Sequence, residues 1–455
     1  MNPSSSSLYL HTKETAGLAV PAGITRIGVV GLGVVDTAMV GHFATKDLAW
    51  LNLANQTFVM FLLVVGMGMM AGTTVLTANA YGRKDYAACG QVWRRTLPYA
   101  ALLGIITLLT SLTATSILSL LGQTPENSQQ AGKLILIQGV GIPGHLLFMA
   151  CTMFLEGCKR PQAGVVMMLG ANLLNVALNY LLIYGNWGLP ELGAEGSAWA
   201  STLVRWSLAV GAIIYVLRAP SLKQFKTRVS MPFNWSDGKK QRSIGYAVGL
   251  SLAAEVGAFN ILTLFAGWLG TLYIAGFGVA VQIMSVPMMI SVGIAVATMV
   301  RTGIAFSEKD TTNIRNAIVS GLLVNLLVIT VFVLLMFTGA TTVFGAFTDD
   351  AHVITLMLPL TGLIVLNALF DSSQGVLSRA LRGIQDTWIP SKIQIFCFVI
   401  LMVPLGYFLG ISLERGLNGL LEAMAIAAAL SLSLLLIRFN FSLRSLQANL
   451  TETQP

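Results

Sequence analysis

The sequence contains little charge for its length. Only 10% of its 455 residues are Asp, Glu, Lys or Arg, whereas 55% are hydrophobic. Soluble globular domains average about 25% charged residues, because most of their surface faces water. The composition therefore excludes an ordinary soluble protein and indicates a membrane protein.

Cysteine and histidine are also scarce, with four of each. The cysteines show no metal-ligand spacing, so we expect neither a disulfide nor a metal bound through them. The histidines His11, His42, His145 and His352 are scattered and form no His/Asp or Cys/His constellation. A membrane-embedded transferase would need such a constellation at a water interface. We therefore do not expect an enzyme.

The chain also lacks a recognisable secretory leader. Its opening stretch, MNPSSSSLYLHTKETAGL, contains no short apolar core and no small-residue cleavage site. Both are features of a signal peptide. We expect the first membrane helix to remain in the mature protein.

What the sequence has in abundance is long apolar segments. A transmembrane helix needs roughly 20 predominantly apolar residues to cross the hydrocarbon core, and its backbone must be helical because lipid offers no hydrogen-bond partners. We predict an all-α polytopic membrane protein with twelve transmembrane helices, near residues 18–44, 48–79, 96–121, 132–156, 163–184, 196–217, 244–269, 273–301, 313–345, 352–379, 389–411 and 417–438.

The basic residues predict the orientation. If both termini are cytoplasmic, 22 of the 27 Lys and Arg residues fall on the cytoplasmic side, as is typical of membrane proteins. The net charge of +8 then faces the anionic lipids of the inner leaflet. It gives no reason to expect a nucleic acid as partner.

Three pairs of similar segments recur along the chain at nearly the same spacing. They are GMGMMAGTTVLTANAYGRKD (66–85) with VGIAVATMVRTGIAFSEKD (292–310), LAWLNLANQ (48–56) with IAGFGVAVQ (274–282), and LEG (155–157) with LRG (381–383). Six crossings return a chain to its starting side, so the two copies share one orientation. We predict two pseudo-symmetric six-helix bundles, residues 1–217 and 244–455, joined by a cytoplasmic linker, 218–243.

Three acids, Asp36, Glu255 and Asp371, lie well inside predicted membrane helices. A carboxylate at the centre of such a helix costs roughly 2.5–3.5 kcal/mol, and intramembrane acids mark ion or substrate pathways. Two like-oriented bundles with such acids are typical of secondary transporters, which work by movement of one half against the other. The sequence therefore indicates a transporter.

Several segments resemble those of the multidrug and toxic compound extrusion (MATE) family, in its NorM-type bacterial branch. The resemblance covers roughly residues 15–440 and rests on GVVDTAMVGHF with DLAWLNLANQ, TANAYGRKD, EGCKRPQAGVVMMLGANLLNVALNYLLIYGNWGLPELGAEG, AAEVGAFN and SRALRGIQDT. It implies a V-shaped, two-lobed antiporter of the bacterial inner membrane. Such a protein would be a monomer without a cofactor, expelling bulky organic cations, including drugs, in exchange for Na+ or H+.

The resemblance also implies a site in the first half of the chain. Asp36 matches the first-helix acid of the family, and Asn175 and Asn179 match the polar pair beside it. Burial without a counter-charge disfavours an ionised carboxyl, whereas a bound cation favours it. Asp36 would thus alternate between neutral and charged forms. The alternative is structural, with Asp36 accepting hydrogen bonds and the two asparagines joining helices.

In the second half, Glu255 and Asp371 match the cation-site acids of the family, and their oxygens would suit a hard cation such as Na+. Asn367 departs from the pattern, because NorM-type proteins often have an aromatic residue there. The alternative is that both acids form structural ion pairs with Arg205 or Arg26, although Arg26 more readily reaches the inner face.

Two other functions remain open on the sequence. A channel would need a continuous pore with a repeat of filter residues, which the sequence does not contain. A dedicated exporter of one endogenous metabolite or lipid-linked precursor would share the same fold. Neither the choice between Na+ and H+ nor the substrate is decided by any residue.

Overall fold

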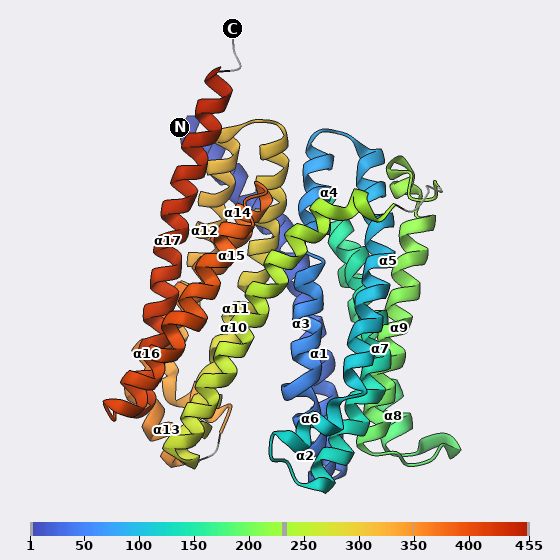
Figure 1. Cartoon of the computed structure of the whole chain (residues 1–455), viewed down its shortest axis with the longest axis vertical. Coiled ribbons are helices and arrows are strands. Elements are labelled where there is room, and N and C mark those ends of the chain that lie inside the picture. The colour runs from blue at the N-terminus through green and yellow to red at the C-terminus, as the bar shows by residue number, and fades with distance from the viewer. Residues whose placement is uncertain (1–2, 230–233, 349, 453–455) are drawn as a thin grey trace. The chain divides into compact units, whose positions relative to one another are not determined.

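The computed structural model describes residues 3–229, 234–348 and 350–452, which form helices joined by short turns, with no β-strand among them (Figure 1). The α-helices are α1 (Pro3–Phe43), α2 (Thr45–Ala54), α3 (Met60–Met69), α4 (Gly72–Gly82), α5 (Tyr86–Ser111), α6 (Ala114–Leu120), α7 (Pro125–Gly157), α8 (Gln162–Ile183), α9 (Ala194–Arg218), α10 (Lys239–Leu269), α11 (Thr271–Ser307), α12 (Thr311–Gly345), α13 (Ala351–Met357), α14 (Thr361–Gly383), α15 (Trp388–Ile395), α16 (Val403–Tyr407) and α17 (Gly416–Glu452).

Short helical segments of other types connect these helices. Three are π-helical, η1 (Asn55–Val59), η6 (Phe396–Met402) and η7 (Phe408–Ser412), and four are 3₁₀ helices, η2 (Asn186–Gly188), η3 (Pro220–Phe225), η4 (Trp235–Gly238) and η5 (Leu358–Leu360). Such segments commonly mark local adjustments inside longer helices.

The number of membrane spans agrees with the sequence. Among the described residues, 11 helices are long and apolar enough to cross a membrane, or up to 12 if the bent pair α5 and α6 forms one span. That pair bends by 50° and covers the predicted third segment. The prediction of an all-α polytopic membrane protein is confirmed.

Contacts divide the chain into two compact units. The first unit contains residues 24–249, and the second unit contains residues 1–23 together with 250–455. The helices α1 and α10 therefore each belong to both units. The chain passes from one unit to the other after Gly23 and again after Gly249. These two positions are separated by the same number of residues as Gln56 and Gln282, which are paired in the sequence repeat. The lobe boundaries drawn at 217 and 244 stay a prediction.

The first unit packs around α7, whose most apolar stretch is 78% buried. The described parts of the predicted linker, residues 218–229 and 234–243, are docked on this unit. Phe225 is buried against Phe154 of α7, with ring centroids 5.6 Å apart. Arg95 of α5 also forms an ion pair with Asp237 over 3.1 Å. These described parts of the linker are therefore packed against the folded unit.

The second unit packs around α11, which lies against α12 and α14. The close approach of α11 to α14 depends on Gly383, where a Cβ atom would lie only 2.1 Å from Thr302 Oγ1. Thr302 Oγ1 in turn donates to the backbone oxygen of Ala380 over 3.1 Å. Small residues and interhelical hydrogen bonds are the usual means of joining helices in lipid, where water does not drive them together.

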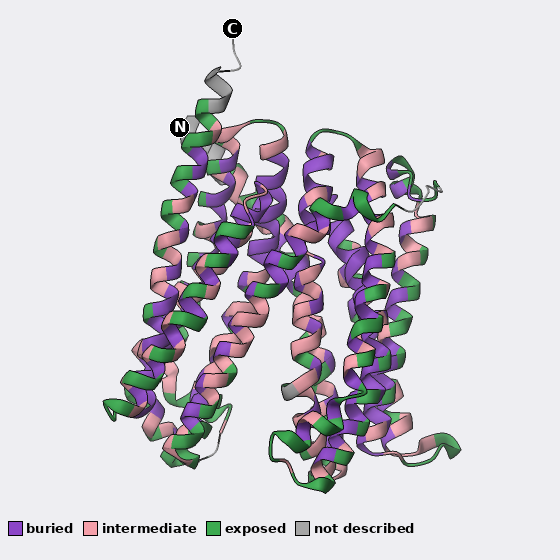
Figure 2. Cartoon of the chain, in the orientation of Figure 1, coloured by how far each residue is buried: buried purple, intermediate pink, exposed green. Residues whose placement is uncertain are grey.

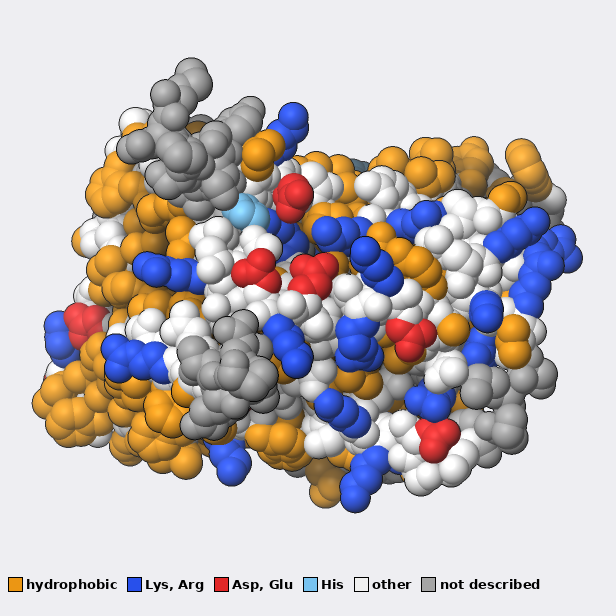
Figure 3. All heavy atoms as spheres, turned by 90° about the horizontal axis from the view of Figure 1, so that it is seen from above, with side chains coloured by type: hydrophobic (Ala, Val, Ile, Leu, Met, Phe, Trp, Pro, Cys, Tyr) orange, Lys and Arg blue, Asp and Glu red, His pale blue; other side chains and the backbone are white. Residues whose placement is uncertain are grey.

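The described surface is dominated by apolar side chains. In Figure 2 each long helix carries exposed positions beside its buried ones, and large residues such as Leu109, Leu173 and Leu334 are more than half exposed. Exposure of this kind suits contact with lipid chains. In the space-filling view of Figure 3, Lys and Arg side chains clearly outnumber Asp and Glu side chains.

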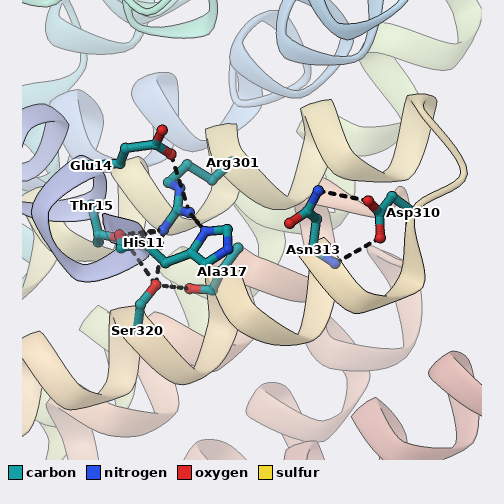
Figure 4. Close-up of polar contacts among 8 residues, drawn as sticks. All are labelled: His11, Glu14, Thr15, Arg301, Asp310, Asn313, Ala317 and Ser320. Atoms are coloured by element: carbon teal, nitrogen blue, oxygen red, sulfur yellow. Dashed lines mark hydrogen bonds and ion pairs between the residues drawn. The ribbon is translucent and has the colours of Figure 1, made fainter. Parts of the chain in front are cut away.

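The beginning of α1 is held in the second unit by Arg301 of α11 (Figure 4). The Arg301 guanidinium donates to the backbone oxygen of His11 over 2.8 Å and to Ser320 Oγ over 2.9 Å. It also contacts Thr15 Oγ1 and His11 Nδ1, and it lies 3.3 Å from a carboxylate oxygen of Glu14. The sequence places Arg301 at the end of the predicted segment 273–301. In the structure α11 extends past Arg301 to Ser307 and leaves it 6% exposed.

The beginning of α10 is held in the first unit by uncharged groups. Gln241 Nε2 donates to Thr96 Oγ1 over 2.7 Å and to Thr73 Oγ1 over 3.0 Å. One turn later, Gly245 lies so close to α3 that a Cβ atom would be 1.7 Å from the backbone oxygen of Met69. The starts of α1 and α10 are thus both fastened by polar contacts, but only the contact at α1 is charged.

Candidate functional site

Asp36 is the centre of a buried polar cluster in the first unit. It lies in α1 and is 6% exposed. Its Oδ1 accepts hydrogen bonds from Asn175 Nδ2 over 3.0 Å and from Asn179 Nδ2 over 2.7 Å. Its Oδ2 accepts one from Ser201 Oγ over 2.5 Å. Both carboxylate oxygens are therefore bound by neutral donors.

The 3.6-residue repeat of the α-helix places the two asparagine donors side by side. Asn175 and Asn179 are four residues apart in α8, so they share one face of that helix. Ser201 comes from α9, which packs against α8. A hydrogen bond to a charged group contributes about 1.5–3 kcal/mol, so three of them are enough to offset the roughly 2.5–3.5 kcal/mol that an acid costs at this depth.

Two oxygens near this cluster have no hydrogen-bond partner in the described part of the chain. They are Asn179 Oδ1 and Ser197 Oγ, and both residues are fully buried. Asn179 belongs to the cluster directly, and Ser197 lies one turn before Ser201 in α9. Buried polar atoms are nearly always hydrogen-bonded. Asn179 Oδ1 therefore leaves acceptor capacity beside Asp36 for a hydrogen-bond donor or a small cation.

The structure brings together all three residues predicted for the first site, Asp36, Asn175 and Asn179. Sequence reasoning missed Ser201, although one signal was available. Ser197 and Ser201 are four residues apart in a predicted membrane span, the same spacing as that of Asn175 and Asn179.

Glu255 and Asp371 line one cavity in the second unit. Glu255 comes from α10 and Asp371 from α14, and the cavity has a volume of about 840 Å³ including space open to the outside. Asn367 lies on its wall, as predicted for a residue one turn before Asp371. The rest of the wall is largely apolar, with Phe259, Met284, Met288, Phe398, Met402 and Met424.

A second, more polar cavity of about 450 Å³ is also lined by Glu255 and Asp371. Its other charged lining residues are Arg379 and Arg382 of α14. Gln374, one turn after Asp371, donates to Asp371 Oδ1 over 3.1 Å. Two ionised carboxylates around one low-dielectric space repel each other, and a cation between them would relieve that repulsion.

Asn367 has its amide nitrogen committed to the backbone. Its Nδ2 donates to the backbone oxygens of Leu363 and Leu421, both over 2.9 Å. The side chain is therefore fixed on the cavity wall by α14 itself and by α17. A role of Asn367 in ion binding stays a prediction.

The two arginines considered as partners of Glu255 and Asp371 are bound elsewhere. Arg26 forms an ion pair with Glu156 over 3.1 Å, and Arg205 donates to the side-chain oxygen of Gln138 over 3.2 Å. Among the described residues, neither arginine forms an ion pair with Glu255 or Asp371, so the alternative of such structural pairs is not supported. The expectation that Arg26 reaches the inner face stays a prediction.

Three further charges lie deeper than the sequence predicts. Glu156, the last residue of the predicted segment 132–156, is in the last turn of α7 and buried. Arg379 and Arg382, counted with the cytoplasmic charges, lie in α14 and line the polar cavity, with Arg382 only 3% exposed. Hydropathy alone does not predict this burial, because it depends on the other helices that pack around these side chains.

Comparisons with known proteins agree on one family. The profile of the MatE family matches residues 21–181 and 247–408. "Probable multidrug resistance protein NorM" of Caulobacter vibrioides is 30% identical over 427 residues, which cover 94% of this chain and 90% of that protein. "Multidrug resistance protein PmpM" of Pseudomonas aeruginosa is 28% identical over 445 residues, covering 95% and 92%.

Solved structures share the fold. "Crystal structure of eukaryotic MATE transporter AtDTX14" superposes with a TM-score of 0.88 at 19% identity, covering 97% of this chain and 99% of that one. "Outward-facing conformation of a multidrug resistance MATE family transporter of the MOP superfamily" gives a TM-score of 0.86 at 18% identity, covering 96% and 97%.

Proposed function

Since this chain belongs to the MatE family, we propose that it is a multidrug antiporter that exports organic, cationic compounds from the cytoplasm in exchange for Na+ or H+. The chain is a membrane transporter and not an enzyme. Export would proceed by alternating access, with the substrate and the coupling ion bound in turn.

The observation that carries this proposal is the pairing of acids with a large apolar cavity. Glu255 and Asp371 lie on the wall of a largely apolar space to which aromatic and methionine side chains contribute. Methionine is flexible and polarisable, so such a wall can repack around ligands of different shape. The carboxylates would select for positive charge. This combination suits varied organic cations better than it suits one metabolite.

The two acid sites support different parts of the cycle. Asp36, bound by three neutral donors, would exchange a proton or small cation against the substrate. Glu255 and Asp371 would supply oxygen ligands of the kind that Na+ accepts. The chemistry of these groups is compatible with either ion, so the coupling ion is to be found by experiment.

We place the protein in the bacterial inner membrane as a monomer with both termini in the cytoplasm. The excess of Lys and Arg over Asp and Glu, 27 against 19, would lie mainly on the cytoplasmic side and attract anionic lipid headgroups. Labelling of single cysteines placed in the loops of a cysteine-free variant would test this orientation.

The direct test is transport by the purified protein in liposomes. Vesicles loaded with a fluorescent organic cation are given an inward Na+ gradient or an inward proton gradient, one at a time. We expect one gradient to drive the cation out against its own concentration difference. Efflux that ignores both gradients would contradict antiport. Transport confined to one compound of a broad panel would instead favour a dedicated exporter.

A further inference from the structure

A buried chain of hydrogen bonds connects Asp371 to Arg382. Arg382 Nη2 donates to Gln394 Oε1 over 2.7 Å, and Gln394 Nε2 donates to Gln374 Oε1 over 3.0 Å. Gln374 Nε2 then donates to Asp371 Oδ1 over 3.1 Å. Three donor–acceptor pairs thus run in one direction, from the guanidinium to the acid at the cavity wall.

Neighbouring hydroxyls hold this chain of hydrogen bonds in place. Arg382 Nη2 also donates to Ser251 Oγ over 3.2 Å, and Ser431 Oγ lies within 3.4 Å of Gln374 Oε1. The two serines, the two glutamines and the arginine are all buried. Gln374, Gln394 and Arg382 also line the polar cavity, and the nitrogen and the oxygen of each glutamine amide both have partners that the protein supplies.

With an arginine at its end, this series of hydrogen bonds can have only one donor-to-acceptor direction. A guanidinium carries donors and no acceptor, whereas a glutamine amide has a donating and an accepting end. Gln394 must therefore present its oxygen to Arg382, which leaves its nitrogen for Gln374. Gln374 must then accept with its oxygen, which leaves its nitrogen for Asp371.

This fixed direction matters for the state of Asp371. An N–H donor favours the ionised form of a carboxyl. If the two amides were free to rotate, the oxygen of Gln374 could face Asp371, and that arrangement favours the protonated acid, which donates instead of accepting. A charged donor at the far end of the chain excludes the rotated arrangement.

We propose that Arg382 is a positioning residue of the cation site, which acts through Gln394 and Gln374 to keep a donor on Asp371 and so keep this acid ready to bind a cation. The inference rests on the proposed function in so far as Asp371 is taken as a cation-binding acid. The other charged groups of the polar cavity are Glu255 and Arg379, and its remaining lining side chains carry no formal charge.

The test follows the protonation of Asp371 directly in the purified full-length protein. Infrared spectra at a series of pH values show a carboxylic C=O band for the protonated acid, assigned by its loss in Asp371→Asn. We expect Arg382→Gln to raise the ratio of protonated to ionised Asp371 at a given pH by about tenfold or more, the lower range for a hydrogen bond to a charged group.

Two further variants separate the hydrogen-bond chain from simple electrostatics. Gln394→Met has a similar size, keeps the Arg382 charge and breaks the chain, so we expect a shift close to that of Arg382→Gln. Arg382→Lys keeps a charged donor and should shift the band little. Arg379→Gln removes a charge from the same cavity without removing a member of the chain, and it should shift the band less than Gln394→Met does.

An unchanged band in Gln394→Met would overturn the inference, as would the absence of a protonated band from every variant across the pH range. Thermal unfolding of each variant checks that it is folded, and Gln394→Met carries the test alone if Arg382→Gln is not. The proposed function is judged separately by Asp371→Asn. If that variant keeps ion-driven transport, the cation-site role of Asp371 fails whatever the infrared result.

Discussion

The two units bury their acids in different ways. In the first unit one carboxylate, Asp36, is bound by three uncharged donors. In the second unit two carboxylates, Glu255 and Asp371, line a cavity that also contains arginines. Fixed neutral donors favour the ionised form of one acid, whereas two acids around an open space gain from a mobile cation. The same repeat thus provides two kinds of site.

The polar contacts at the starts of α1 and α10 also differ between the two units. The offset that pairs Gln56 with Gln282 also pairs Thr15 of α1 with Gln241 of α10, so these two residues occupy matching places in the repeat. Thr15 contacts the buried charge of Arg301, whereas Gln241 contacts only the hydroxyls of two threonines. The repeat preserves the position of each contact while its chemistry has changed.

The largest effect is expected from Asp36→Asn. The variant keeps the shape of the side chain and can still receive hydrogen bonds on its oxygen, so the protein should insert and fold. Loss of one charge of a buried pair costs roughly 2–5 kcal/mol, so binding of a cation at this site should weaken by at least about thirtyfold. Drug resistance conferred on a pump-deficient host should disappear at normal expression. Full resistance would remove Asp36 from the mechanism.

Glu255→Gln and Asp371→Asn test whether the two acids of the second site act together, since the first site has only one acid. If both acids bind one cation, each change should weaken ion binding, and the double variant should lose less than the sum by about 0.5–3 kcal/mol. Ion titration of the four proteins measures this coupling. Strict additivity would mean that the two acids act separately.

Ser201→Ala tests whether the neutral donors hold the charge of Asp36. Removing one hydrogen bond to a charged group should lower the free energy of unfolding by about 1.5–3 kcal/mol. Ser433→Ala is a suitable control, because Ser433 is exposed and bonds only its own helix. Equal stability of Ser201→Ala and the control would show that this donor contributes nothing to the burial of Asp36.

The smallest effects are expected from changes to the polar contacts at the starts of α1 and α10. Gln241→Met should destabilise the first unit by about 1–3 kcal/mol, since it leaves buried hydroxyls with fewer partners. Arg301→Met should destabilise the second unit by a comparable amount that falls with added salt, because Glu14 is exposed to solvent. Thermal unfolding at low and high salt distinguishes the two. An equal salt response would contradict the charge difference.

The sequence predicts most of the fold and the centre of each site. Apolar length fixes the spans, because lipid permits only helices here, and the isolated acids stand out against an apolar background. Ser201, Gln374 and Gln394 could not be predicted in the same way. They are uncharged residues whose roles arise only when distant helices place them beside an acid.

The depth of the arginines and of Glu156 was also beyond the sequence. An arginine at the end of an apolar run usually reaches the water interface, but Arg301 and Arg382 are buried by neighbouring helices. Their partners include residues from distant parts of the chain, such as His11 for Arg301 and Ser251 for Arg382. Local hydropathy contains no information about such distant contacts.

Reciprocal coupling between substrate and ion tests most directly whether the buried acids carry out antiport. Equilibrium binding of a fluorescent organic cation to the purified protein is titrated with Na+ at constant ionic strength, and then with pH. If both ligands depend on the same buried acids, a saturating ion should raise the apparent dissociation constant of the organic cation roughly 5–150-fold, and the organic cation should weaken ion binding by the same factor. If neither ion changes the affinity beyond general screening, antiport by these acids is contradicted.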